Sequence, residues 1–350
     1  MNRKVAAITG DGKFTVIEEQ IPELKKGQVL VEVKASLISP GTELMGIPAL
    51  RKEPKADMKP RKFGYSNAGV ILKQGEGCED LPKGMRVACM GGNYALHSNY
   101  ACIPRNLLIP IPDGMSFETA SFAHLAATSL HGLRRADLQI GEYLAVSGLG
   151  LVGNIALQIA AASNVHVIGL DRLKKRLELA KKGKADGLVD LSDKKDEDVI
   201  REVKEFTRGY GLDSALMCFG GNMSSALELT AKMMKVAPDT HKMGRIVIVG
   251  VANFSLTNWP VSFGNIDLRS SSRPGAGYHD DAYEHGRDYP SVFVQWTNKR
   301  NMEEALLMHQ SGRINLDMLI THRIPLSKFA EGAEILVSNP NDALGVIINY

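Results

Sequence analysis

Hydrophobic and polar residues alternate over short runs in the first third of the chain, which is the pattern of half-buried β-strands. The runs are Lys4–Thr9, Phe14–Glu18, Val29–Ala35, Ala68–Lys73, Arg86–Cys89 and Asn99–Ile103. Turn-forming pairs such as Asp11-Gly12 and Lys83-Gly84 separate them. Many short strands without a long helix predict a compact, barrel-like β domain over residues 1–121.

The pattern changes near Ser116, which with Glu118 and Thr119 begins a helical stretch, and strands then alternate with helices. The predicted strands are Tyr143–Ser147, Val165–Leu170, Leu212–Cys218 and Arg245–Val249. The predicted helices are Gly153–Ala162, Leu173–Lys182, Lys194–Thr207 and Ser224–Met234. Strict alternation of this kind predicts an α/β fold, a doubly wound parallel sheet with helices on both faces, over residues 122–272.

Residues 273–350 differ again, because they begin with a long loop rich in Pro, Gly and Tyr over residues 273–297. Two helices, Asn301–Gln310 and Phe329–Ser338, and a closing strand, Leu344–Asn349, are predicted after it. The loop holds many hydrogen-bonding side chains, which would suit a polyhydroxylated substrate. A dimer-interface or surface arm is the alternative.

A glycine-rich turn follows the strand Tyr143–Ser147. Gly148-Leu149-Gly150-Leu151-Val152-Gly153 matches GxGxxG, and the matching context is a preceding strand, a following helix and Asp171 at the next strand's end. Gly148 would allow the tight turn, Gly150 the approach of a pyrophosphate, and Gly153 close packing of the helix. The free amides of the helix start, at Leu151 and Val152, would then stabilise the phosphates. The alternative is a similar fold that binds another nucleotide or none.

Asp171 indicates which dinucleotide is preferred. A carboxylate there can accept hydrogen bonds from both ribose hydroxyls and repels a 2′-phosphate, which favours NAD. Arg172, directly after it, could instead pair with the 2′-phosphate of NADP. NAD is therefore predicted, with NADP as the alternative.

Composition excludes several other classes. The 350 residues are 44% hydrophobic, and the net charge of +3 is spread without the clustered basic stripe of nucleic-acid-binding proteins. The four cysteines form no CxxC pair, which favours reduced thiols and a cytoplasmic protein. We expect no signal peptide, and no apolar run reaches about 18 residues, so no membrane contact is predicted.

Several segments carry a resemblance to a known family. They are VLVEVKASLISPGTEL, FGYSNAGVI, LPKGMRVACMGG, LLIPIPDGMSFETASF, SGLGLVG and LITHRIPLSKFAEGAEIL. Across the whole chain they resemble the medium-chain dehydrogenase/reductase superfamily. HLAATSLHGLRRADLQIGE and RDYPSVFVQWTNKRNMEEAL are most similar to its zinc-alcohol-dehydrogenase-like branch, which includes the N-terminal half of bi-domain oxidoreductases.

The resemblance implies an architecture. Residues 1–121 would be a GroES-like β-barrel catalytic domain, residues 122–272 a Rossmann domain, and residues 273–350 a return to the catalytic domain. The active site would lie in the cleft between the domains. Pairing of the last Rossmann strand, around Leu268–Ser272, would give a homodimer or homotetramer.

The chain departs from the family at the zinc ligands. Ser39-Pro40-Gly41-Thr42-Glu43 replaces the motif that carries a ligand cysteine, and Gly64-Tyr65-Ser66 replaces the Gly-His-Glu motif. The third ligand position falls on His124, so one candidate of three remains, whereas a catalytic zinc takes three protein ligands and a water. We expect no catalytic zinc. The alternative is an irregular site of His124 with His97 or Cys89.

Without a metal, side chains must polarise the substrate oxygen and move a proton. Thr42 is in the position of the family's hydroxyl beside the substrate oxygen, and Tyr65 replaces a ligand and could donate from its phenol. His124 could act as acid or base near pH 7. A turn threonine, a packed strand tyrosine and a buried core histidine are the structural alternatives. Glu43 would orient its neighbours or cap the turn.

The resemblance extends to the cofactor. Val249-Gly250-Val251 ends the strand where the family's backbone contacts the nicotinamide amide, and Cys218-Phe219 ends another. Arg176 resembles the basic residue near the adenine ribose, although a solvated helix face would equally explain it. Gly345 stands where the family often has a basic residue that reaches the pyrophosphate.

These observations predict a zinc-independent NAD(P)-dependent oxidoreductase for an alcohol or ketone group of a polar, sugar- or polyol-like small molecule. One alternative is a quinone or enone reductase. The other is a dinucleotide-binding protein that has lost catalysis and acts as a sensor or scaffold.

Overall fold

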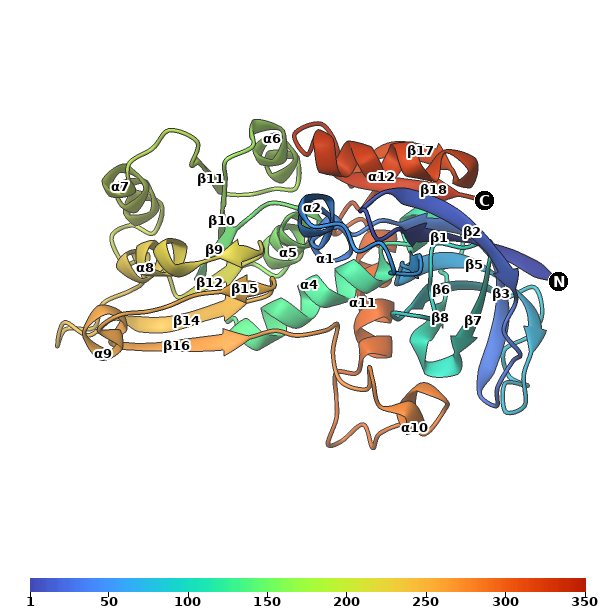
Figure 1. The fold of residues 1–350 in the computed structure, drawn as a ribbon. Coiled ribbons are helices and arrows are strands. Elements are labelled where there is room, and N and C mark those ends of the chain that lie inside the picture. The colour runs from blue at the N-terminus through green and yellow to red at the C-terminus, as the bar shows by residue number, and fades with distance from the viewer. The chain divides into compact units, whose positions relative to one another are not determined.

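The computed structural model describes residues 1–350, residue 260 by its backbone alone. The chain divides into two compact units (Figure 1). The first unit is made of residues 1–128, 273–311 and 316–350, and the second of residues 129–272 and 312–315. The division first falls inside helix α4 (Ala123–Ala136), between Thr128 and Ser129.

The second unit is built on a six-stranded parallel sheet in the order β11-β10-β9-β12-β14-β16. Its strands are β9 (Tyr143–Ser147), β10 (His166–Asp171), β11 (Gly187–Asp190), β12 (Ser214–Met217), β14 (Met243–Ile248) and β16 (Asn265–Ser270). Numbered within this unit, the order is 3-2-1-4-5-6, which is the Rossmann topology, and the prediction of a doubly wound sheet is confirmed. A small pair, β13 (Gly221–Asn222) with β15 (Ala252–Asn253), lies beyond it.

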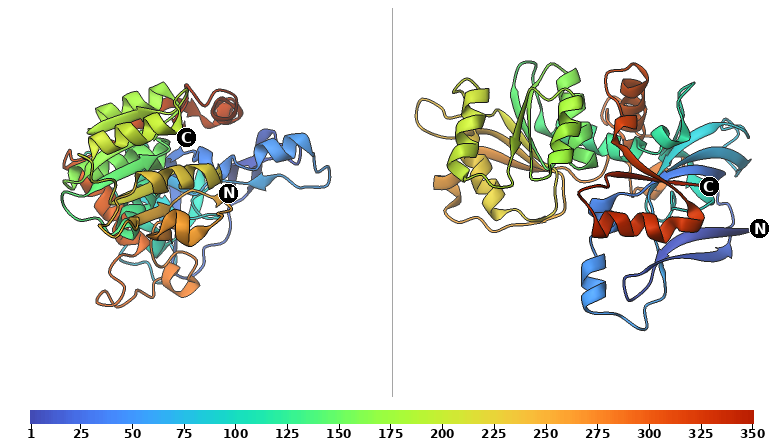
Figure 2. Two further views of the ribbon diagram at one scale, coloured as in Figure 1. Left: turned by 90° about the vertical axis from the view of Figure 1, so that its left-hand side faces the viewer. Right: turned by 90° about the horizontal axis from the view of Figure 1, so that it is seen from above.

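Helices cover both faces of this sheet (Figure 2). They are α5 (Leu151–Ala162), α6 (Lys174–Lys182), α7 (Asp196–Phe206), α8 (Ser224–Met233) and α9 (Trp259–Phe263). Since side chains alternate along a strand, Ile168 and Leu170 of β10 join one core cluster with Val199 and Val203 of α7. Val167 points the other way and is equally buried. Burial on both faces of the sheet explains why β10 is a nearly uninterrupted run of apolar residues in the sequence.

The first unit carries two further sheets. One has the order β17-β18-β3-β5-β6-β8 with β7 paired to β3, and the other is β2-β1-β4. The strands are β1 (Asn2–Ile8), β2 (Phe14–Gln20), β3 (Gln28–Leu37), β4 (Arg61–Lys62), β5 (Ser66–Gln74), β6 (Arg86–Met90), β7 (Tyr100–Pro104), β8 (Leu108–Pro110), β17 (Ile320–Pro325) and β18 (Gly345–Asn349). Strand β18 pairs antiparallel with β3, so residues from the two ends of the numbering share one sheet.

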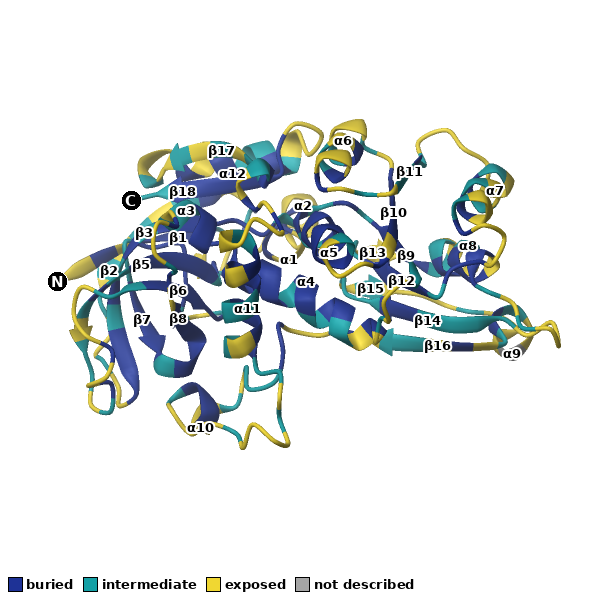
Figure 3. Ribbon diagram, turned by 180° about the vertical axis from the view of Figure 1, so that it is seen from behind, coloured by how far each residue is buried: buried dark blue, intermediate teal, exposed yellow. Residues whose placement is uncertain are grey.

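Helices of four to thirteen residues complete the first unit. They are α1 (Pro40–Glu43), α2 (Ile47–Lys52), α3 (Phe117–Ala120), α10 (Asp281–Glu284), α11 (Asn298–Gln310) and α12 (Phe329–Ser338), with 3-10 turns at Arg105–Leu107, Asp317–Leu319 and Leu326–Lys328. A second core cluster, which includes Ile8, Phe63 and Phe329, lies between α12 and the sheets. Buried residues concentrate along β3, β5 and α4, while the outer faces of α6 and α7 are exposed (Figure 3).

Several local expectations are corrected. Helix α7 begins at Asp196, later than the predicted Lys194, with Lys195 as its N-cap and no side-chain cap. The three acidic residues of its first turn interact favourably with the positive end of the helix dipole. The last Rossmann strand is Asn265–Ser270, earlier than 268–272. Strands β11 and β17 and the helices α1 and α2 were not predicted, because short elements give weak periodicity. No helix in the described part of the chain is long and apolar enough to cross a membrane.

Candidate active site and dinucleotide site

The glycine-rich turn joins β9 to α5 at the carboxyl end of the sheet. Gly148 has a φ of +86°, and its N–H donates to the carbonyl of Leu170 at 2.9 Å. A Cβ on Gly153 would lie 1.9 Å from the carbonyl oxygen of Gly148. The first turn of α5 therefore packs against the glycine turn so closely that only a residue without a side chain fits.

The start of α5 offers unpaired amides. Gly150 is the N-cap, and a Cβ placed on it would have no atom within 4 Å. The amides of Leu151, Val152 and Gly153 begin the helix, where no carbonyl of the helix itself is available to them. They lie at the positive end of the helix dipole beside open space, and this arrangement fits a pyrophosphate.

Asp171 lies at the end of β10 and is buried. Its Oδ2 accepts the N–H of Leu149 at 2.6 Å and its Oδ1 accepts the N–H of Leu173 at 2.9 Å. Each oxygen keeps a further lone pair, so the carboxylate can still accept from a ribose. The guanidinium of Arg176 lies 3.9 Å from Oδ2, whereas Arg172 is exposed.

The ends of β12 and β14 meet the same turn. A Cβ on Gly148 would lie 3.0 Å from Cβ of Phe219 and 3.1 Å from the carbonyl carbon of Cys218. A Cβ on Gly250 would lie 1.8 Å from the carbonyl oxygen of Phe219. Val249 and Gly250 both donate their N–H to the carbonyl of Met217. Val251 is exposed. The predicted cofactor residues thus gather at the carboxyl ends of β9, β12 and β14, where doubly wound sheets bind ligands.

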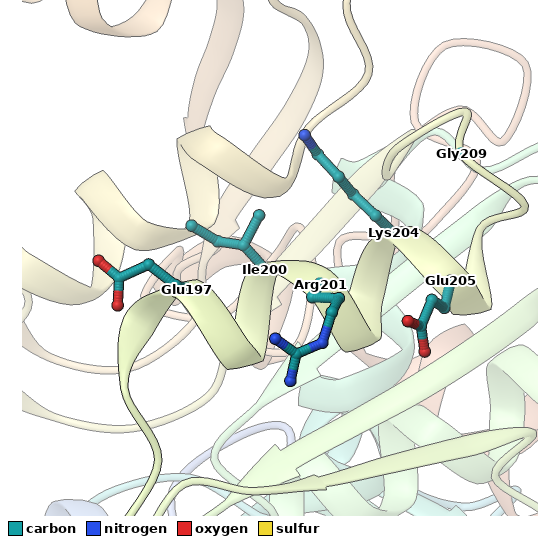
Figure 4. Close-up of a pocket in the computed structure, with 6 residues that line it drawn as sticks. All are labelled: Glu197, Ile200, Arg201, Lys204, Glu205 and Gly209. Carbon is teal, nitrogen blue, oxygen red and sulfur yellow. The ribbon is translucent and has the colours of Figure 1, made fainter.

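A depression of about 480 Å³ runs along α7 (Figure 4). Its lining residues are Glu197, Ile200, Arg201, Lys204, Glu205 and Gly209. None of the predicted site residues lines it. We assign it no role, because it is a shallow feature on the outer face of one helix.

The first unit brings the predicted catalytic residues together. Ser39 and Thr42, around α1, have their hydroxyls within hydrogen-bonding reach of the phenol of Tyr65. Burial, followed by the charge of Glu43, raises the pKa of Tyr65 above its ordinary value. The phenol therefore stays protonated, as a hydrogen-bond donor must.

His124 adjoins this phenol. Its ring centroid lies 4.5 Å from that of Tyr65, and its Nδ1 lies 3.0 Å from the backbone carbonyl of Tyr65. Burial lowers the pKa of His124 to about 4. The ring is neutral at pH 7, Nδ1 carries the hydrogen that the carbonyl accepts, and Nε2 is an acceptor. The expectation that His124 titrates near pH 7 is wrong, because burial penalises the charged ring; only a role as acceptor or base remains.

This burial predicts a pH dependence of stability. The pKa of His124 is about 4 when folded and near 6.5 when unfolded, so the unfolded chain binds more protons between these values. The contribution of His124, on the order of 3 kcal/mol, is complete above pH 6.5 and is lost as the pH falls toward 4. We expect His124→Gln to flatten the acid side of a plot of melting temperature against pH. The exposed His166→Gln should leave that slope unchanged, and equal slopes in all three proteins would contradict the assignment.

Tyr278, from the segment 273–297, is a member of this cluster that the sequence did not single out. Its ring meets His124 edge-on at 6.2 Å, and its hydroxyl oxygen accepts the N–H of Gly92 at 2.6 Å. The segment therefore contributes at least one phenol beside Tyr65 and His124. Composition marked the segment as polar, but nothing in the order of its residues distinguished Tyr278 from its other tyrosines.

The side chains do not fit a catalytic zinc. Among the residues that the structure describes, no group of three His, Cys, Asp or Glu side chains is arranged to hold a metal ion. His97, the first alternative partner of His124, directs its Nε2 at Glu43. Cys89, the second, is buried, and burial raises the pKa of its thiol, whereas zinc binds the thiolate. We therefore derive no step through a metal.

Comparison with known proteins finds similarity to dehydrogenases. Residues 152–284 match the family model described as zinc-binding dehydrogenase. The (R,R)-butanediol dehydrogenase of Neisseria gonorrhoeae is 25% identical over 83% of this chain and 81% of its own length. The D-arabitol-phosphate dehydrogenase of Enterococcus avium is 24% identical over 95% of this chain and 96% of its own.

Solved structures share the fold across the whole chain. An Escherichia coli alcohol dehydrogenase in complex with NADH superposes with a TM-score of 0.77 at 19% identity, covering 100% of this chain and 99% of its own. A dehydrogenase of Sinorhizobium meliloti with bound NADP gives 0.75 at 19%, covering 100% of both chains. Together with this Rossmann topology and this glycine turn, these relatives identify an alcohol dehydrogenase-like oxidoreductase that is similar to members of the medium-chain dehydrogenase/reductase superfamily.

Proposed function

We propose that the chain is a zinc-independent, NAD-preferring dehydrogenase that acts on an alcohol or ketone group of a polar, polyol-like small molecule. The observation that carries the proposal is the cluster of Thr42, Tyr65 and His124, with Tyr278 beside it, in a chain whose second unit has a glycine turn suited to a pyrophosphate. Two relatives are named for a diol and a sugar-alcohol phosphate, which supports a polyol-like substrate.

The proposed chemistry divides between the two units. A bound nicotinamide would accept or give the hydride. Gly148–Gly153 would hold the pyrophosphate through bare amides, Asp171 the adenine ribose, and the backbone at Cys218-Phe219 and Val249–Val251 the nicotinamide end.

The first unit would supply the polar groups around the substrate oxygen. Tyr65 would donate a hydrogen bond to that oxygen, and Thr42 would relay its proton. Nε2 of His124 would accept from a neighbouring hydroxyl, and the phenol of Tyr278 would bind another. Such positioned donors and acids contribute about 10²–10⁴-fold to the rate. A row of hydroxyl-binding groups suits a substrate with several hydroxyls better than a quinone.

Calorimetric titration with NAD and NADP, with metal analysis of the same sample, tests the proposal. We expect NAD to bind with a dissociation constant at least tenfold below that of NADP, and activity with a panel of diols, polyols and their phosphates to survive dialysis against a chelator. A protein that binds neither cofactor would refute the dehydrogenase assignment. One that needs stoichiometric zinc would refute only the metal-free chemistry.

Asp171→Asn is expected to reduce the preference for NAD over NADP about tenfold, because the substitution removes the charge that repels a 2′-phosphate and keeps one acceptor oxygen. Dissociation constants for both cofactors measure the effect. Asp186→Asn is the matched control, since Asp186 accepts the N–H of Val167 at the opposite end of β10. If both variants change the preference for NAD over NADP equally, the carboxylate of Asp171 does not determine which ribose the protein binds.

A further inference from the structure

The row of polar side chains beneath Tyr65 and Thr42 has no part in the chemistry described so far. Oε2 of Glu43 accepts the N–H of Ser39 at 2.6 Å and lies 3.3 Å from Nε2 of His97. Nδ1 of His97 lies 2.8 Å from Oγ of Ser36, which lies 2.7 Å from the hydroxyl of Tyr350. Four polar side chains, drawn from β3, α1 and the segments that follow β6 and β18, thus form one continuous row.

Most of this row is shielded from water. His97 and Ser36 are fully buried and Glu43 is 7% exposed. The rings of Phe63 and Phe329 pack against the imidazole at 5.2 and 6.2 Å. Tyr350 is only partly buried. The row therefore starts beside the catalytic cluster and ends at Tyr350, a partly exposed residue whose phenol has a pKa raised by burial.

Glu43, at the inner end of the row, has a carboxylate oxygen that can accept a further hydrogen bond. Oε1 of Glu43 is buried and, among the described residues, has no hydrogen-bond partner of acceptable geometry, although it also lies 3.3 Å from Nε2 of His97. Glu43 directly follows Thr42 in α1, and Ser39 and Thr42 both reach the phenol of Tyr65. A buried carboxylate oxygen without a partner is costly unless a water or a ligand hydroxyl satisfies it. The charge of Glu43 raises the pKa of Tyr65, so this carboxylate acts on a group that would surround a substrate hydroxyl.

The middle of the row must hold a shared proton. A carboxylate and an unprotonated imidazole nitrogen are both acceptors, so at 3.3 Å a hydrogen must lie between Glu43 and His97. Imidazole can take a proton at one nitrogen while it releases another from the second. Hydroxyl groups such as those of Ser36 and Tyr350 both donate and accept, so each can pass a proton along the row.

We propose that Glu43 and His97 form the buried proton acceptor of this site, and that Ser36 and Tyr350 carry the proton outward to solvent. This inference rests on the proposed function. In alcohol oxidation the C–H bond gives its hydrogen with both electrons to the nicotinamide, the C=O bond forms, and the O–H proton is left over. That proton passes through the hydroxyl of Thr42 or a water to Glu43, then through His97, Ser36 and Tyr350. In ketone reduction the proton moves through the same residues in the opposite direction, toward the substrate oxygen.

The most direct test removes a hydroxyl group from the end of the row that is farthest from the proposed substrate position. Ser36→Ala and Tyr350→Phe each remove one hydroxyl. We expect kcat for alcohol oxidation to fall about tenfold, with KM and the NAD dissociation constant unchanged and a larger solvent deuterium isotope effect on kcat. Ser98→Ala is the matched control, because Ser98 is equally buried but donates to the backbone carbonyl of Tyr100 at 2.7 Å. It should change the melting temperature and leave kcat and the isotope effect unaltered.

A second measurement separates failure of the relay from failure of the proposed function. In proton NMR of the free protein with ¹⁵N-labelled histidine, we expect a strongly downfield proton on Nε2 of His97 that is lost in Glu43→Gln. Ser36→Ala and Tyr350→Phe proteins that match Ser98→Ala in kcat and isotope effect would overturn the relay. An NMR signal that Glu43→Gln leaves unchanged would overturn the proton-holding pair. If the wild type oxidises no alcohol with either cofactor, the proposed function fails and the relay fails with it, even where the NMR signal supports the pair.

Discussion

Gly150→Val is expected to weaken NAD binding at least 100-fold while the melting temperature stays within about 2 °C of the wild type. The new Cβ would meet no protein atom, since nothing lies within 4 Å of its position. It would instead enter the space beside the amides of Leu151 and Val152, where the pyrophosphate is expected. A hundredfold change corresponds to about 2.7 kcal/mol of binding free energy.

Two other glycines supply the controls. Gly46→Val tests the general cost of the substitution, because Gly46 also has free space around its Cβ position and an ordinary φ of −80°. Gly153→Val should instead impair folding, because its Cβ would lie 1.9 Å from a carbonyl oxygen. If Gly150→Val binds NAD as the wild type does, the dinucleotide does not lie against the start of α5.

Tyr65→Phe is expected to lower kcat about 10²–10³-fold with an unchanged NAD dissociation constant. The ring keeps its contact with His124, and only the hydroxyl that Ser39 and Thr42 reach is removed. Steady-state kinetics with the best substrate of the polyol panel, together with cofactor titration, measures the change.

Tyr143→Phe serves as the comparison for Tyr65→Phe, because Tyr143 lies in the second unit and packs against His166 and Phe206. It should leave kcat within about twofold of the wild type, as surface and peripheral packing changes generally do. A Tyr65→Phe enzyme that keeps full kcat would show that the phenol packs against His124 and takes no part in the reaction.

The Rossmann unit could be predicted from the sequence because its signals are local. The central strands β9, β10 and β12 are largely apolar runs, and the glycine turn, the following helix and Asp171 lie within one strand–helix–strand unit. The boundaries of α12 were correct for the same reason, since its apolar face repeats over a full helix. Short elements could not be predicted, because a helix such as α1, with four residues, is too short to show a periodic pattern.

The proposed catalytic cluster could be predicted only in part. Thr42, Tyr65 and His124 came from a resemblance between motifs, but their state did not, because the pKa of His124 depends on burial that only the folded chain defines. Tyr278 was missed because its contact with His124 joins positions far apart in the chain. The pairing of Glu43 with His97 was missed for the same reason, since sequence patterns of period 2 or 3.6 carry no information about such distant neighbours.

The pairing of β18 with β3 has a consequence for how the protein is made. A ribosome releases residues 129–272 in full before residues 345–349, so all strands of the parallel sheet are synthesised while Ala35–Leu37 of β3 still lack β18 as their antiparallel neighbour. Until then the hydrogen-bonding groups of Ala35–Leu37 on that side of β3 are open to another nascent chain, while Gln28–Glu32 are paired with β7. Assembly of the newly synthesised polypeptide is therefore most vulnerable in the interval between the synthesis of these two segments.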